Sequence, residues 1–178
     1  TEINNLLMSD DVLHTLNAFK TLGVKIEKSN DKIIIYGKGL NSLKKPNRNI
    51  YLGNSGTSAR LLTGLLASQT FESILEGDHS LSSRPMARIM DPLKLMGAEF
   101  ENISGTLPLK IIGKKLNKSK IEIEIPSAQI KSGLILASLN IEGISHIIEK
   151  NTTRDHTENM LKSFGADINV EKKNNQTS

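Results

Sequence analysis

The chain has 178 residues, of which 37% are hydrophobic and 3% aromatic, so it can form a packed domain with an aliphatic core. It has no cysteine, which excludes disulfides and thiolate chemistry, and no apolar stretch near the ~20 residues of a membrane helix. Its net charge of +4 favours anionic partners, but without an aromatic stacking surface it gives little support for nucleic-acid binding. We therefore expect a cytoplasmic domain with no nucleic-acid or membrane partner.

Apolar residues at helical spacing predict a helix over residues 11–23, and Gly23 is typical of the position just after a helix. Strand signals follow it at residues 24–27 and 32–36. The same helix pattern returns at residues 86–97 and 156–165, each time ending in glycine, and strand signals at residues 98–101 and 107–112 follow the second copy. The copies lie roughly 70 residues apart, a period that fits a unit of several helices and strands.

A second kind of helix precedes this one in the later two copies. Residues 57–68 and 128–139 are apolar on nearly all faces and rich in small side chains, which predicts buried, closely packed helices. The fold class is therefore α/β (α+β), built from repeated β-α-β-α-β-β units with buried helices and outer sheets.

We expect one incomplete domain of three such units. Residues 1–48 form a partial first unit, whose buried helix would precede Thr1, and residues 49–120 form the second. Residues 121–178 form the third, truncated at its end, because residues 167–171 predict a strand while residues 172–178 are polar and give no partner strand.

Three predicted helix starts combine small or hydroxylated residues with Arg or Lys, at residues 53–60, 82–88 and 127–132. Helix N-termini carry free backbone N–H groups and a partial positive charge, so they suit anions. The first of them follows a short strand at residues 50–52 through a glycine-rich turn. Together they predict a site for a substrate with several negative charges.

Individual side chains at these starts leave alternatives open. Arg60 is either a ligand clamp or the structural partner of an acid, and Arg84 either binds a carboxylate or phosphate in bidentate fashion or is a surface charge. Gln129 enters an apolar helix and needs polar partners, whereas Lys131 faces a different direction. Arg154 precedes its helix much as Arg84 does. The histidines are scattered without ligand spacing, so we expect no metal site.

Four segments in order resemble the 5-enolpyruvylshikimate-3-phosphate (EPSP) synthase family of enolpyruvyl transferases. They are GNSGT at residues 53–57, GDHSLSSRPM at 77–86, SAQIKS at 127–132 and TRDHTE at 153–158. The resemblance runs from Thr1 to about residue 170 and implies most of the N-terminal domain of that fold. Members transfer the enolpyruvyl group of phosphoenolpyruvate to shikimate 3-phosphate and release phosphate, with no cofactor, in aromatic amino acid biosynthesis.

The resemblance also implies roles, residue by residue. Phosphoenolpyruvate binding is implied for Asn54, Gly56, Arg84 and Gln129. Shikimate 3-phosphate binding is implied for Ser127, Ala128, Gln129 and Arg154. The family's catalytic acid-base residues belong to a second domain that this sequence lacks, so we expect no catalytic residue and no turnover in this chain alone. The inhibitor glyphosate occupies the phosphoenolpyruvate pocket in the family, and glycine at position 56 leaves room for it.

Two other functions remain open. UDP-N-acetylglucosamine enolpyruvyl transferase shares the repeated architecture, but its usual reactive cysteine loop has no counterpart in this cysteine-free chain. A non-catalytic domain could use the same anion pockets for ligand sensing, or weakly for nucleic acid.

Overall fold

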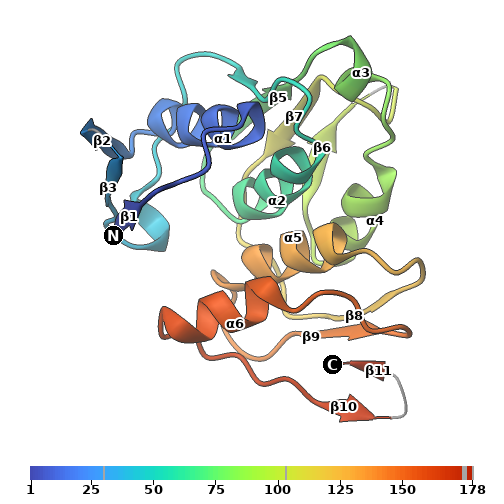
Figure 1. The fold of residues 1–178 in the computed structure, drawn as a ribbon. Coiled ribbons are helices and arrows are strands. Elements are labelled where there is room, and N and C mark those ends of the chain that lie inside the picture. Colours follow the sequence, from blue (N-terminus) through green and yellow to red (C-terminus); the bar gives the residue numbers. More distant parts are fainter. Residues whose placement is uncertain (30, 103, 174–175, 178) are drawn as a thin grey trace.

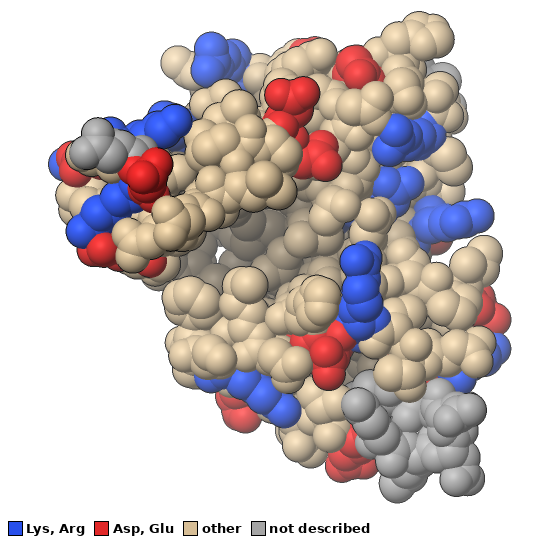
Figure 2. All heavy atoms as spheres, in the orientation of Figure 1, with Lys and Arg blue, Asp and Glu red and all other residues tan. Residues whose placement is uncertain are grey.

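The computed structural model describes residues 1–29, 31–102, 104–173 and 176–177. Three small sheets lie on the outside, and two central helices, α2 (Gly56–Ala67) and α5 (Ala128–Ser138), lie between them (Figure 1). The face seen in Figure 2 is hollowed between the part that carries the first sheet and the part below it, and acidic and basic side chains are interspersed over the rest of that face. No helix in the described part of the chain is long and apolar enough to cross a membrane.

The middle unit shows the predicted alternation of elements. In chain order it contains β4 (Ile50–Tyr51), α2, β5 (Glu72–Glu76), α3 (His79–Ser82), α4 (Ala87–Leu95), β6 (Glu99–Glu101) and β7 (Leu109–Ile112). The sheet order is β4-β5-β7-β6, in which β4 and β5 are parallel and the other pairs antiparallel. Only the four-residue α3, which Asp78 caps by accepting the Leu81 N–H at 2.7 Å, was not predicted from the sequence.

The last unit repeats this arrangement. Its elements are β8 (Lys120–Ile123), α5, β9 (His146–Glu149), α6 (His156–Ser163), β10 (Lys172–Lys173) and β11 (Gln176–Thr177). The order β8-β9-β11-β10 matches that of the middle unit, and β8 and β9 are likewise parallel.

The strand prediction for the end of the chain was wrong. Residues 167–171 form no strand, and the hairpin lies in the polar segment instead, where β11 pairs with β9 through Thr177 opposite Glu149. Which residues form a strand here depends on their register against the neighbouring strand β9. The alternation of apolar residues at 167–171 carries no information about that register.

The first unit contains α1 (Asp10–Thr21) and the strands β1 (Glu2–Asn4), β2 (Lys25–Ser29) and β3 (Lys32–Tyr36), followed by the short 3-10 helix η1 (Leu40–Ser42). Its antiparallel order, β1-β3-β2, corresponds to β5-β7-β6 of the middle unit. The predicted helix and hairpin are therefore confirmed, and β1 is an addition. We propose boundaries between units near residues 48 and 120, because new sheets begin with β4 at Ile50 and with β8 at Lys120.

The two central helices pack against each other at a pair of glycines. A Cβ built on Gly64 of α2 would lie 1.9 Å from the carbonyl oxygen of Gly133 in α5, so the backbones touch directly. The starts of α2 and α5 are thereby held close together. Around them lies an aliphatic core whose fully buried members include Leu52, Leu66 and Leu134.

Candidate anion-binding site

The glycine-rich turn between β4 and α2 fixes one wall of the site. Gly53 has φ +55°, a conformation that favours glycine, and Ser55 caps α2 by accepting the Ser58 N–H at 3.3 Å. Between them, the exposed Asn54 donates to the Asp78 carboxylate at 3.0 Å and accepts a hydrogen bond from the Arg84 guanidinium. The Asn54 amide therefore links Arg84 to Asp78, the N-cap residue of α3, and holds Arg84 at the turn.

Three guanidinium groups converge beside this turn. Arg60, in the first turns of α2, donates from Nη1 to the Gly56 carbonyl at 2.9 Å and from Nη2 to the Pro85 carbonyl at 3.4 Å. Burial, together with the positive charges of Arg84 and Arg88, lowers the pKa of the Arg60 guanidinium. In the described part of the chain no ion pair joins Arg60, Arg84 or Arg88 to a carboxylate. A bound anion would relieve this repulsion.

The start of α5 forms the opposite wall. Ser127 caps the helix, its hydroxyl oxygen accepting the Ile130 N–H at 3.4 Å. Gln129 donates from Nε2 to the Thr57 hydroxyl at 3.0 Å and so joins the starts of α5 and α2. The polar partner that the sequence required for Gln129 is thus a side chain of the neighbouring helix.

Between these walls lies a cavity of about 340 Å³. It is lined by Asp11, Asn54, Gly56, Thr57, Arg60, Arg84, Arg88, Ser127, Gln129 and Ile130. Five predicted residues therefore meet there, namely Asn54, Gly56, Arg84, Ser127 and Gln129. Ala128 and Arg154 do not line it, although Ala128 is the first residue of α5 and Arg154 is an exposed residue just before α6.

Sequence reasoning was incomplete for three further side chains. The suggestion that Arg60 pairs with an acid was wrong, because its partners are two backbone carbonyls. Arg88 lies one turn beyond Arg84 and was not singled out, although that spacing was a usable signal. Asp11 comes from α1 in the first unit, and nothing in its local sequence predicted that it would line this cavity.

Among the described residues no cluster of three His, Cys, Asp or Glu side chains could hold a metal ion. The chemistry of the cavity is instead that of guanidinium, amide and hydroxyl donors at two helix starts. Fold and site together define an α/β domain of repeated units with a pocket suited to phosphates and carboxylates.

A sequence model of EPSP synthase (3-phosphoshikimate 1-carboxyvinyltransferase) matches residues 1–178, and the chain belongs to this family. Relatives named 3-phosphoshikimate 1-carboxyvinyltransferase include those of Ruthia magnifica, 52% identical over 97% of this chain, and Lactiplantibacillus plantarum, 48% identical over 94%. The EPSP synthase of Acinetobacter baumannii is similar in structure, with a TM-score of 0.92 and 45% identity over 99% of this chain. The chain spans about 40% of the length of each of these relatives.

These matches confirm the resemblance that the four motifs indicated, and the neighbour shares the enolpyruvyl transferase fold. They also favour the EPSP synthase family over the UDP-N-acetylglucosamine enzyme and over a non-catalytic domain, since the named relatives are synthases.

Proposed function

We propose that this chain provides one wall of the active site of a cytoplasmic enzyme that transfers the enolpyruvyl group of phosphoenolpyruvate to shikimate 3-phosphate. The observation that carries the proposal is the convergence of Arg60, Arg84 and Arg88 without carboxylate partners in the described chain. A ligand that carries a phosphate and a carboxylate matches this excess of positive charge. The relatives' names supply the reaction.

Phosphoenolpyruvate would bind at the glycine-rich turn, through Asn54, Gly56, Arg84 and Gln129. The guanidinium fork of Arg84 can hold two anionic oxygens, and the hydrogen bond to Asn54 fixes its orientation. Gly56 supports this assignment because the guanidinium Nη1 atoms of Arg60 and Arg84 would lie within about 3 Å of any Cβ at that position. The absence of a side chain there leaves both guanidinium groups accessible to a ligand.

Shikimate 3-phosphate would bind at Ser127, Ala128, Gln129 and Arg154. The Ser127 hydroxyl accepts a hydrogen bond from its helix and keeps its own proton to donate to a phosphate oxygen. In this arrangement the chain's residues bind, orient and neutralise the two substrates. Proton transfer would come from acid-base groups of a second domain, so we assign no catalytic residue and no cofactor to this chain.

Calorimetric titration of the chain tests this proposal. Shikimate 3-phosphate and phosphoenolpyruvate should bind, whereas UDP-N-acetylglucosamine and a short single-stranded oligonucleotide should not. Tighter binding of the nucleotide sugar or of the oligonucleotide would overturn the assignment and favour one of the two alternatives.

We predict that the 178-residue chain alone has no synthase turnover, because positioning without proton transfer does not complete the reaction. The measurement is phosphate release from the two substrates. A composite enzyme, in which this chain replaces the matched part of the Acinetobacter baumannii EPSP synthase, should release phosphate. Release by the chain alone above the enzyme-free rate would contradict the prediction, and a folded but inactive composite would contradict the proposed function.

The composite enzyme should also be sensitive to glyphosate, and Gly56→Ala should weaken glyphosate more than phosphoenolpyruvate. The added Cβ would lie 2.9 Å from Arg60 Nη1 and 3.0 Å from Arg84 Nη1, so both flexible side chains must shift. One methyl group in a close-packed pocket changes binding by roughly 10- to 200-fold. We expect that range for the longer inhibitor and a smaller rise in KM for phosphoenolpyruvate.

The inhibition constant and the KM of each variant provide the comparison. Gly37→Ala is the control, since a Cβ there has nothing within 4 Å. Equal losses for both ligands, or resistance while Gly56 is present, would show that the pocket is arranged differently.

A further inference from the structure

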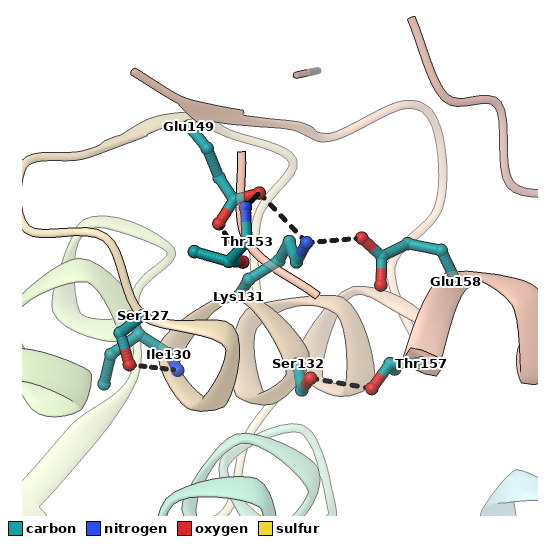
Figure 3. Close-up of polar contacts among 8 residues, drawn as sticks. All are labelled: Ser127, Ile130, Lys131, Ser132, Glu149, Thr153, Thr157 and Glu158. Carbon is teal, nitrogen blue, oxygen red and sulfur yellow. Dashed lines mark hydrogen bonds and ion pairs between the residues drawn. The ribbon is translucent and has the colours of Figure 1, made fainter. Parts of the chain in front are cut away.

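A buried ion-pair network lies beside the cavity, on the side of α5 that faces β9 and α6 (Figure 3). The Lys131 ammonium is 2.9 Å from Oε2 of Glu149 and 2.7 Å from Oε1 of Glu158. These three side chains are only 4%, 1% and 5% exposed. The sequence predicted that Lys131 faces a different direction from Gln129. In the structure that direction is the interior, away from the ligand cavity.

The ion pairs fix the positions of α5, β9 and α6 relative to one another, but burying the three charged groups costs desolvation free energy. Burial alone would lower the pKa of the Lys131 ammonium, but its hydrogen bonds and ion pairs with Glu158 and Glu149 outweigh burial and raise it. Two carboxylates share one cation, and Oε2 of Glu158 is buried without a hydrogen-bond partner among the described residues. Apolar side chains often stabilise such a position as well as a buried ion pair does. Stability alone therefore does not account for this arrangement.

The same network ties down the segment between β9 and α6. Glu149 accepts a hydrogen bond from the Thr153 hydroxyl and another from the Thr153 N–H at 3.4 Å. On the other side of the segment, the hydroxyls of Ser132 and Thr157 are 2.7 Å apart. Arg154 follows Thr153 directly and precedes α6, so the backbone on both sides of it is held by these contacts.

The fixed end of this arrangement is the first turn of α5. Lys131 lies two residues beyond Gln129, and the Lys131 N–H donates to the carbonyl of the N-cap residue Ser127 at 3.1 Å. One turn of helix thus presents Ser127 and Gln129 to the cavity on one side and Lys131 to the network on the other. The network spans the distance between the start of α5 and the segment that carries Arg154.

We propose that Lys131 is a positioning residue for shikimate 3-phosphate, holding the segment of Arg154 in register with Ser127 and Gln129. This inference rests on the proposed function, in which Arg154 contacts that substrate. Lys131 itself is too deeply buried to touch the ligand. Its effect should therefore pass through Arg154, and a purely structural lysine would not show that dependence.

The test is an NMR titration of the 178-residue chain with shikimate 3-phosphate and, separately, with phosphoenolpyruvate. An apolar network variant, Lys131→Met with Glu149→Met and Glu158→Met, removes the charges without leaving an unpaired one. We expect at least tenfold weaker binding of shikimate 3-phosphate and less than a twofold change for phosphoenolpyruvate. Thr153→Val is a smaller change that removes only the hydroxyl hydrogen bond to the Glu149 carboxylate. It should give a smaller loss, of about threefold, because the Thr153 N–H still donates to Glu149.

A double-mutant cycle with Arg154→Ala completes the test. In the Arg154→Ala background, the apolar network and Thr153→Val should cause no further loss of shikimate 3-phosphate affinity. Additive losses, equal losses for both ligands, or unchanged affinity in folded variants would overturn the proposal. If the apolar variant does not fold, the Thr153→Val cycle decides alone. A wild-type chain that binds neither substrate would instead overturn the proposed function, and the inference with it.

Discussion

Replacing Arg84 by alanine should strongly weaken phosphoenolpyruvate recognition. The substitution removes a guanidinium fork that the turn already orients through Asn54, and it breaks the chain of hydrogen bonds from Asp78. Losing one partner of a buried, hydrogen-bonded charge pair costs about 2–5 kcal/mol. At 1.4 kcal/mol per tenfold change, kcat/KM of the composite enzyme for phosphoenolpyruvate should fall by roughly 30-fold or more.

Two further variants make the Arg84 measurement specific. Arg84→Lys keeps the charge but loses the fork, so its loss should lie between those of the wild type and Arg84→Ala. Arg48→Ala removes the same charge from an exposed residue that lines a separate cavity, and it should leave kcat/KM unchanged. Phosphoenolpyruvate kinetics that stay unchanged in Arg84→Ala would refute the assignment of this residue.

Gly64→Ala should destabilise the fold far more than Gly37→Ala or Gly56→Ala. Alanine favours a helix over glycine by up to about 1 kcal/mol. Against that gain, the new Cβ would lie 1.9 Å from the Gly133 carbonyl oxygen, a backbone atom that no side-chain rotation can move. Overpacking a core costs about 1–3 kcal/mol and occasionally more. The cost of the clash should therefore exceed the gain in helix propensity, because α2 and α5 must separate to relieve the clash.

Thermal unfolding followed by circular dichroism measures this effect. A net loss near 2 kcal/mol corresponds to a fall in Tm of about 4–8 °C for a chain of this size. Gly37→Ala, which meets nothing within 4 Å, should leave Tm nearly unchanged. A Gly64→Ala variant as stable as the wild type would mean that the two helices do not approach as closely as the structure has them.

The amino-acid sequence by itself determined the repeated α/β architecture, the buried helices and the position of the anion-binding turn. These features depend on short-range signals: helical spacing of apolar residues, glycines after helices, and small residues with an Arg at a helix start. The motif around Gly56 illustrates this, because its turn, its cap at Ser55 and its helix all form within a few residues. Such local rules do not require knowledge of distant contacts.

The tertiary structure alone decided which side chains from different units meet. Asp11 reaches the cavity from the first unit, and Arg60 donates to two backbone carbonyls. The sequence places Lys131 at a helix start suited to anions, yet the packing of α5 against β9 and α6 buries it between Glu149 and Glu158. The strand register at the end of the chain was likewise beyond the reach of local rules. Burial, charge pairing and strand register depend on contacts between residues far apart in the chain, and those contacts exist only once the units have packed together.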